Sequence, residues 1–415
     1  MKLFNLIIAF FLVAGVSQAA TLAELQEQAL NSRNLIKKYQ ANLEISRRDQ
    51  ALARSSLYPA LDLSYTVNAL DEDSAVENSE NSVAKGVISW NLFAGFADHY
   101  KIKSARLARQ AEEFKLQGLR QDIRLNVALL YLGVYSRQAS LQVAQDAWAT
   151  LDRVHADAQN SFKVGLIKKN ELLRFKLDLD HAAIVLKKAR AELDKGVRLL
   201  EREVDGKLEL AELSFGEFVQ LPSLQADSGY EARMLARRSE LKALQELAEA
   251  ARAQTRAAYG GIYPKVDLSG SYRRYNDDYG IDGDNPDEEL RTQLTLSINL
   301  FDGFAKQARV GKARRLADAL GYDLAELESE LKMQLKNLLL DYEVSAENVA
   351  VAQGSIEQAE ENLRISRLAY KEGLEKESDL LDAITNLSRA RSNQVAARGE
   401  LFADYFKIDR AVEGL

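Results

Sequence analysis

The sequence predicts a mainly α-helical protein that also carries two β-hairpins, and three observations predict this fold class. Proline is scarce, and because proline breaks a helix interior, the long proline-free gaps leave room for very long helices. Four stretches of about ten residues alternate apolar and polar side chains, which is typical of strands. The chain also repeats its own landmarks in one order, which indicates two halves of one architecture. The only prolines among the 415 residues are Pro59, Pro222, Pro264 and Pro286.

Residues 1–20 are expected to be a cleaved secretory signal. Lys2 supplies the positive end, Leu6 to Val16 form the apolar core, and Ala19 lies among small residues suited to cleavage. The core is about half as long as the ~20 residues that a spanning helix needs; the alternative is a retained anchor. No later segment is apolar enough for a transmembrane helix, so we expect an exported protein without a helical membrane span.

Three pairs of matching segments divide the mature chain into two structural repeats. The repeats are expected over residues 21–205 and 228–415. Gly206 and Pro222 interrupt the helical pattern between them, so residues 206–227 are expected to form a linker. The offset is 205 positions for the first pair and 208 for the other two. The pairs are Tyr58–Ser64 with Tyr263–Ser269, Asn91–Phe96 with Asn299–Phe304, and Phe162–Leu166 with Tyr370–Leu374.

Each repeat is expected to carry one β-hairpin, over residues 60–93 in the first and 265–301 in the second. The strands have about the ten residues that a tilted strand needs to cross a bilayer. In the second strand, the alternation places Trp90 and Leu92 on the same face. We therefore expect a membrane β-hairpin portion, and the alternative is a half-buried set of strands in a soluble sandwich.

Two features of the hairpins concern the membrane. The connections over residues 71–82 and 276–289 hold five and seven acidic residues and no basic one, so they belong in water beyond the lipid. Four strands leave two open edges, which cannot exist in lipid, and bacterial barrels begin at about eight strands. One chain cannot close a barrel, so several chains are expected to share one.

The rest of the chain is expected to form coiled-coil helices, because apolar or small residues recur at steps of three and four. A helix of ~65 residues would be about 100 Å long, and two shorter helices placed end to end roughly match one long helix. The simplest packing sets each long helix beside such a pair. The helices are expected over residues 21–57, 96–161, 169–205, 228–258, 304–369 and 376–412.

Composition excludes several classes of function. Lys and Arg number 55 and Asp and Glu 62, a net charge of −7, which argues against a nucleic-acid partner. The chain has no cysteine, which removes disulfides, thiolate nucleophiles and Cys-ligated metals. His99, His155 and His181 lack metal-ligand spacing to one another. We expect no catalysis, no cofactor and no metal site.

Taken together, these markers resemble the TolC family of outer-membrane efflux and secretion channels, over residues 22–415. The duplicated Tyr-Pro at strand entry, the Asn-Leu-Phe-x-Gly-Phe at strand exit and the turns at Gly165 and Gly373 carry the resemblance. It implies a homotrimer in which a trimeric α-barrel tunnel continues into a shared 12-stranded outer-membrane β-barrel. It also implies a periplasmic adaptor, an inner-membrane pump and a passive exit duct for a tripartite efflux pump or a type I secretion system.

The sequence departs from the family in two places that concern the ends of the chain. It lacks the N-terminal cysteine of the lipidated branch, and it lacks the C-terminal extension that some members wrap around the middle of the tunnel. The equatorial linker over residues 206–227 is therefore expected to form a small collar. The implied location is the outer membrane, with the helical tunnel in the periplasm and the barrel in contact with lipid.

Asp379 and Asp382 are the strongest candidate site residues. They lie three positions apart at the start of the last expected helix, a spacing that points both to one face. They match the Asp-x-x-Asp that lines the constricted entrance in the TolC family, where three chains would form two rings of carboxylates that attract cations. The alternative is helix capping, because acidic residues are favoured in a first helical turn.

The resemblance also assigns contacts that would hold the entrance closed. Tyr370 matches the tyrosine of the family's closed entrance, and Asn170 and Glu171 lie in the equivalent turn of the first repeat, where a carboxylate partner is placed. The alternative for Tyr370 is ordinary packing at the tip. Glu375 stands where the family often has an arginine, which would weaken the lock and add negative charge.

The two helix turns expose apolar residues where water would favour polar ones. This placement indicates a contact with another protein, and the resemblance implies the adaptor. The expected docking tips are Val164, Gly165, Leu166 and Ile167 in the first repeat, and Gly373 and Leu374 in the second.

A rival hypothesis is a soluble periplasmic coiled-coil adaptor or scaffold. Adaptors also carry long helical hairpins, but they combine them with compact domains of short strands. The bilayer-length strands and acidic connections of this chain favour the channel.

Overall fold

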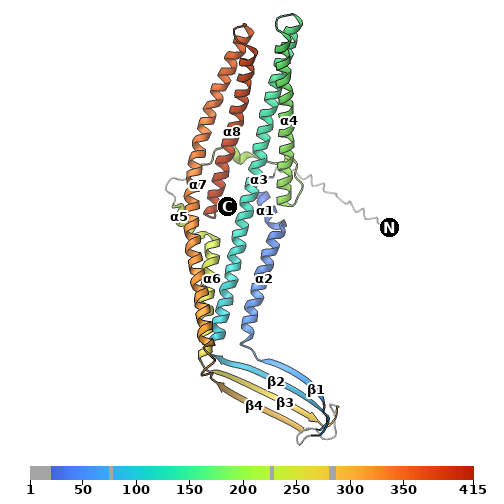
Figure 1. Ribbon diagram of the computed structural model, residues 1–415, viewed down its shortest axis with the longest axis vertical. Helices are drawn as coiled ribbons and strands as arrows, with labels where there is room; N and C mark the ends of the chain where they lie inside the picture. Colours follow the sequence, from blue (N-terminus) through green and yellow to red (C-terminus); the bar gives the residue numbers. More distant parts are fainter. Residues whose placement is uncertain (1–19, 74–77, 225–228, 280–286) are drawn as a thin grey trace, which may run out of the picture. The chain divides into compact units, whose positions relative to one another are not determined.

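The computed structural model describes residues 20–73, 78–224, 229–279 and 287–415. The expected signal lies outside these residues apart from Ala20, as do parts of the linker and of both acidic connections. Figure 1 shows the elements. The helices are α1 (Leu22–Ser32), α2 (Asn34–Ser55), α3 (Ala97–Lys163), α4 (Lys169–Val204), α5 (Tyr230–Arg237), α6 (Ser239–Tyr259), α7 (Ala305–Lys371) and α8 (Glu377–Ala411). The strands are β1 (Ala60–Ala69), β2 (Glu80–Ala94), β3 (Lys265–Asn276) and β4 (Asp287–Ser297).

Two of the expected helices are each divided by a single residue with an extended backbone. Arg33 separates α1 from α2 at φ −61° and ψ 125°, and Arg238 separates α5 from α6 at φ −53° and ψ 115°. The expectation of unbroken helices over 21–57 and 228–258 was therefore wrong. Neither break has a glycine or proline; at Arg33, an ion pair to Glu203 of α4 at 3.5 Å accompanies the change of direction.

The described residues form two compact units, and each unit combines segments of both sequence repeats. The long helices α3 and α7, 67 residues each, contribute to both units. The first unit contains residues up to 36, 120–231 and 334–415, and the second contains 37–119 and 232–333.

In the second unit the four strands form one antiparallel sheet in the order β1-β2-β3-β4. The register aligns Leu63, Gly86, Tyr272 and Leu290 in one row across the sheet. One face is therefore apolar, and most of its large side chains are exposed. The apolar face consists of Leu61, Leu63, Tyr65, Val67, Ile88, Trp90, Phe93, Val266, Leu268, Tyr272, Leu290, Leu294 and Leu296.

A β-bulge in β2 changes the expected alternation. The register shifts between Asn91 and Phe93, so that Phe93 lies opposite Val266. Phe93, rather than Leu92, therefore continues the face of Trp90, because one extra residue in a strand moves the following side chains to the other face. The expectation for Leu92 was wrong at this point. In the second hairpin β4 ends at Ser297, before the expected end at 301.

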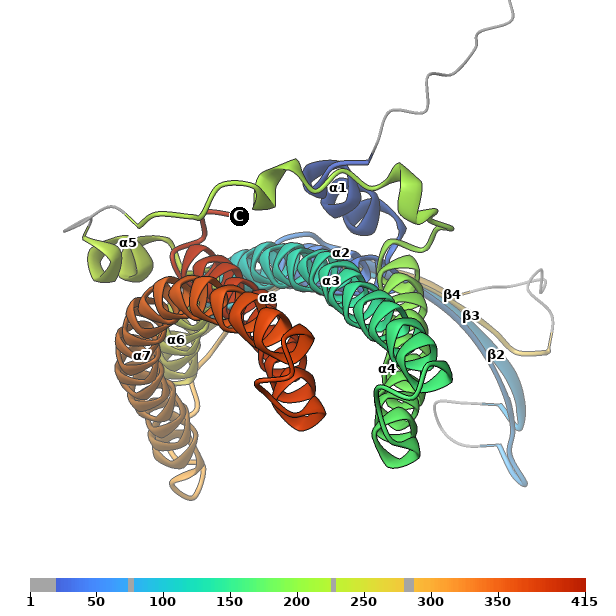
Figure 2. The ribbon, with the colours of Figure 1, turned by 90° about the horizontal axis from the view of Figure 1, so that it is seen from above.

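In the first unit the linker is held against α3 and α8, as Figure 2 shows. Tyr131 of α3 is fully buried, and its hydroxyl donates a hydrogen bond to the carbonyl of Ser214. Its ring centroid lies 4.9 Å from that of Phe215 and 5.6 Å from that of Phe218. Arg398 of α8 donates to the Phe218 carbonyl at 2.7 Å. The linker is thus a packed segment across two helices.

Far from the linker, the first unit has a second apolar core, which we call the tip core. It joins α3 and α4 to α7 and α8 near the turns that connect each pair. The buried members of the tip core are Leu151, Ala158, Phe175, Leu179, Ala182, Leu363, Leu380, Leu381, Ala383 and Ile384.

No helix in the described ranges is both long and apolar enough to cross a membrane.

Candidate functional site at the helix turns

The turns between α3 and α4 and between α7 and α8 have the same backbone geometry. Gly165 has φ +81°, and its N–H donates to the Phe162 carbonyl at 3.0 Å while the N–H of Leu166 donates to the Ser161 carbonyl at 2.9 Å. These two bonds define a Schellman motif, which needs a left-handed residue and favours glycine. The turn at Gly373 repeats the pattern with φ +72° and distances of 3.1 and 2.9 Å. Both turns are therefore fixed in shape.

The apolar side chains of the turns divide into two groups. Val164, Leu166 and Leu374 have 71%, 78% and 80% of their surface exposed. Ile167 instead packs against the tip core. Three of the expected docking side chains are thus available to a partner, whereas Ile167 anchors its own turn.

Asp379 and Asp382 lie on the exposed face of α8, next to the turn. Asp379 accepts a hydrogen bond from the backbone N–H of Lys376 at 3.2 Å, so it does cap the helix. No hydrogen bond or ion pair to Asp382 occurs within the described residues. Leu380, Leu381 and Ala383 between and beyond them are buried in the tip core. Capping therefore accounts for one carboxylate and leaves the other without a structural role in the single chain.

Tyr370 lies between the two helical hairpins of the tip. It is half-buried, and its ring meets that of Phe175 of α4 edge-on at 5.9 Å. Burial, followed by the nearby carboxylates of Glu171 and Glu377, raises its pKa. The described residues contain no hydrogen bond between Tyr370 and Glu171, and Asn170 lies exposed in the first turn of α4. Ring packing, rather than a hydroxyl bond, joins Tyr370 to α4 within one chain.

An ion pair that sequence reasoning missed also joins the hairpins at the tip. Arg174 of α4 donates from Nη1 to Oε1 of Glu377 in α8 at 3.0 Å. The two residues are 203 positions apart, so no local spacing signals the pair. From the sequence alone, Glu377 is explained as an acidic residue in the first turn of a helix, so nothing indicates its ion pair with Arg174.

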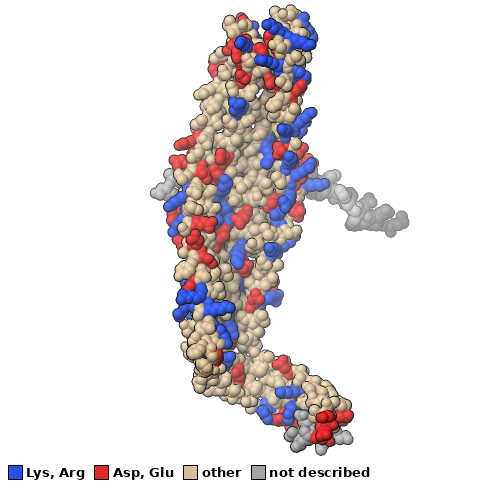
Figure 3. All heavy atoms as spheres, viewed as in Figure 1, with Lys and Arg blue, Asp and Glu red and all other residues tan. Residues whose placement is uncertain are grey.

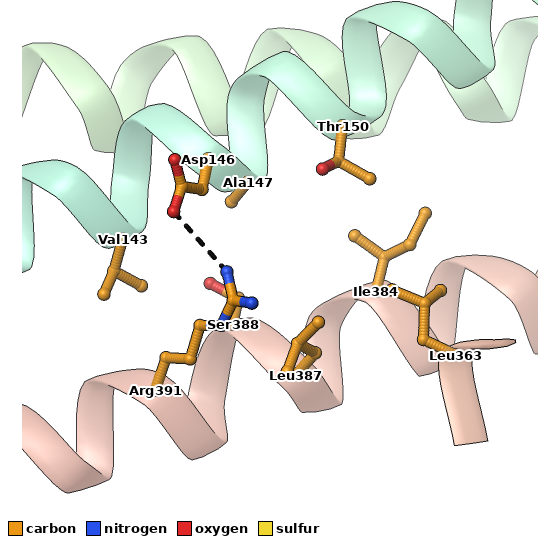
Figure 4. A pocket seen from close by; sticks show the side chains of 9 residues that line it. All are labelled: Val143, Asp146, Ala147, Thr150, Leu363, Ile384, Leu387, Ser388 and Arg391. Carbon is orange, nitrogen blue, oxygen red and sulfur yellow. Dashed lines mark hydrogen bonds and ion pairs between the residues drawn. The ribbon is translucent and has the colours of Figure 1, made fainter. Parts of the chain in front are cut away.

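A second polar link joins the hairpins farther from the turns. Figure 4 shows Arg391 of α8 directed toward Asp146 of α3, and the two side chains are 3.5 Å apart. Arg391 also pairs with Glu360 of α7 at 2.9 Å. The adjoining cavity has about 30 Å³, room for a water or two but not for cargo. The cavity is therefore part of the packing between helices.

The tip brings together exposed carboxylates, a half-buried tyrosine and an ion pair between the two helical hairpins. Carboxylates brought together from several copies would attract cations.

The outer membrane efflux protein family matches residues 25–201 and 232–412. The chain belongs to this family. Outer membrane protein TolC of Escherichia coli is 23% identical over 96% of the chain and 83% of its own length. Protein CyaE of Bordetella pertussis is 24% identical over 80% of the chain and 67% of its own length. The fold is similar to a crystal structure of CusC with a TM-score of 0.86 and 16% identity, covering 94% of this chain and 91% of that one.

Membership settles the class of function. The protein is an outer-membrane exit duct for efflux or secretion, with its helical tunnel in the periplasm, and it is not an enzyme. The fold class predicted from the sequence is confirmed, and the adaptor hypothesis is not favoured. TolC-like channels are trimers that work with adaptor and pump partners.

Proposed function

We propose that three copies of this channel form one duct whose periplasmic entrance is narrowed by rings of Asp379 and Asp382. The observation that carries the proposal is the exposure of both carboxylates on one face of α8 while their neighbours are buried in the tip core. Two carboxylates in each of three chains amount to six. Like charges confined to a narrow pore attract cations and hinder anions.

Unpartnered apolar surface supports the trimer. The apolar face of the sheet ends at the free edges of β1 and β4, which lipid would not tolerate. In the first unit, α4 exposes Leu173, Leu177 and Ile184 at helical spacing. On α7, Leu340, Val344 and Val351 do the same. Steps of four and seven are those of coiled-coil seams, so we assign the two stripes to contacts between copies.

The remaining tip residues divide between gate and docking surface. Tyr370 and its contact with Phe175 favour the closed entrance, with Asn170 and Glu171 in the adjoining turn. Val164, Leu166 and Leu374, on turns fixed by Gly165 and Gly373, form the surface for a periplasmic adaptor, with Ile167 holding the first turn in place. The adaptor would bring the pump that selects the cargo.

Single-channel recording tests the entrance ring. With Asp379→Asn and Asp382→Asn combined, we expect the half-blocking concentration of a trivalent cation to rise about tenfold or more, because tenfold corresponds to only about 1.4 kcal/mol of lost attraction. The matched control is Glu326→Gln with Glu330→Gln, two exposed acids of α7 in the other unit, which should leave the block unchanged. If the Asp variant keeps wild-type block and only its melting temperature falls, capping is the whole role and the ring is wrong.

A further inference from the structure

A groove in the second unit gathers arginines from two helices. Arg252, Thr255 and Arg256 of α6 form one wall, and Arg314, Asp318 and Tyr322 of α7 the other. Ala317 and Gly321 complete the lining, and the groove encloses about 470 Å³. Figure 3 shows Lys and Arg side chains gathered over α6 and the first part of α7. We call this feature the arginine groove.

Two of the three guanidinium groups in the arginine groove have neutral neighbours. Arg314 donates to the hydroxyl of Tyr259 at 2.9 Å, and Arg256 lies 5.7 Å from the ring centroid of Tyr100. Within the part of the chain that the structure describes, Arg252 is the one member of the three that pairs with a carboxylate, that of Glu249 at 2.5 Å. The one acid of the lining, Asp318, is already paired with Arg315 at 3.1 Å. The groove therefore keeps an excess of positive charge.

This excess is a cost to the folded chain. Arg252 and Arg256 are four positions apart on one helix face, where like charges destabilise a helix. Arg314 adds a third charge from across the groove. An anion bound between them would offset the repulsion, and guanidinium groups bind phosphate and carboxylate oxygens in a bidentate fork.

The lining between the arginines leaves open space at Gly321. A Cβ added at Gly321 would meet no atom within 4 Å, so the glycine is not needed for close helix packing at this point. Ala317 and Gly321, four positions apart on α7, carry almost no side chain and lie in the lining with Tyr322. They leave room for the apolar portion of a ligand whose anionic group meets the arginines.

We propose that the arginine groove binds an anionic group, of the phosphate or carboxylate class, carried by a molecule with an apolar portion. A membrane phospholipid and an exported amphiphile both have this chemistry. The site lies on helices of the second unit and does not depend on the entrance ring.

The test uses the assembled full-length channel and two probes. In the first experiment, inorganic pyrophosphate is titrated into the channel in detergent and its binding is measured by calorimetry. In the second, the channel is taken from phosphatidylcholine nanodiscs prepared with or without phosphatidylglycerol. Native mass spectrometry then counts the phosphatidylglycerol molecules that remain bound. We expect the combined Arg252→Gln, Arg256→Gln and Arg314→Gln variant to bind pyrophosphate about tenfold more weakly. The control neutralises Lys187, Lys188 and Arg190, three exposed basic residues of α4, and should bind like the wild type.

A second variant keeps the charges and fills the groove. Gly321→Leu should leave the trimer intact and weaken pyrophosphate binding, because the added side chain extends into the open space at this position of the groove. Loss of phosphatidylglycerol retention in both variants would identify a lipid as the source of the ligand, and pyrophosphate block of single-channel current would identify a solute inside the duct. Equal binding of both probes by wild type and triple variant would overturn the proposal. So would loss of the trimer in the triple variant, which would assign the arginines to a contact between copies.

Discussion

Arg174 and Glu377 form an ion pair between two helical hairpins, at the end of the chain's first unit where the entrance is proposed. The side chain of Glu377 is 13% exposed and that of Arg174 58%, so water screens the pair from one side only. Exposed pairs contribute about 0.2–1 kcal/mol, and we place this pair near the upper limit. Three such pairs in a trimer would act together against opening.

Breaking this pair should make the entrance open more readily. We expect Glu377→Gln, which removes the pair from all three copies, to raise the open fraction at least fivefold, since about 1 kcal/mol for a single pair corresponds to that ratio, as measured by single-channel conductance. The charge swap Arg174→Glu with Glu377→Arg should restore the closed state. Lys176→Gln is the control, because Lys176 pairs with Asp180 of its own helix at 2.7 Å and links no hairpins. Wild-type conductance in Glu377→Gln would contradict a gating role.

Tyr370 predicts a response to alkaline pH. Its pKa is raised in the folded chain, above about 10 for a free tyrosine, so folding favours the protonated hydroxyl. The stabilisation is complete below about pH 10 and is lost as pH rises toward the folded pKa. A tyrosinate would then be repelled by Glu171 and Glu377.

We therefore expect the conductance of the wild type to rise only above about pH 10, as the pH approaches the raised pKa of Tyr370. Tyr370→Phe should lack this rise, because the ring contact with Phe175 remains and nothing titrates there. Ion preference should be the same in both proteins below that pH. A rise of equal size in Tyr370→Phe would place the alkaline response elsewhere.

The helices, strands and turns could be predicted from the sequence wherever residues close together in the chain determine them. The long helices α3 and α7 follow from spacing, the strands from alternation, and the turns at Gly165 and Gly373 from glycine at a helix end. The breaks at Arg33 and Arg238 could not be foreseen, because residues at these positions are ordinary in helices. The bulge at Leu92 and the pair of Arg174 with Glu377 depend on partners distant in the sequence, which periodicity does not report. The burial of Ile167 could not be predicted either, because it depends on packing against the tip core, whose residues are distant in the sequence.

The turns at Gly165 and Gly373 should contribute to adaptor binding rather than to the stability of the folded channel. Replacing Leu166 and Leu374 with serine should reduce export strongly, because the adaptor loses two apolar contacts, while the thermal midpoint stays nearly unchanged since both side chains are exposed. Export is measured in cells that carry the matching adaptor and pump. Val219→Ser, at an apolar linker residue that is also exposed, is the control. Normal export by the double variant would remove the tips from the adaptor contact.

For the whole molecule, the open edges of β1 and β4 predict how copies join. The chain has no cysteine, so engineered pairs crosslink without background. Ser64→Cys in β1 combined with cysteines scanned along β4 should yield a covalent trimer in denaturing gels at the matching register. Ser89→Cys with Ser269→Cys, which face each other within one chain, should give only crosslinked monomer. Dimers alone, or no product between chains, would contradict a barrel of twelve strands shared by three chains.

The likeness of the two turns has a consequence for symmetry. Their backbones are alike, but residues 163–169 carry three lysines and no acid, whereas residues 371–377 carry two lysines and three glutamates. A threefold assembly would present six tips of one shape that alternate between basic and acidic. Six identical partner subunits would then make two kinds of contact, three with the basic turns and three with the acidic turns. Neutralising an acidic residue of the partner would weaken only the three contacts with the basic turns. A partner arranged as three subunits could instead recognise one kind of tip and leave the other vacant.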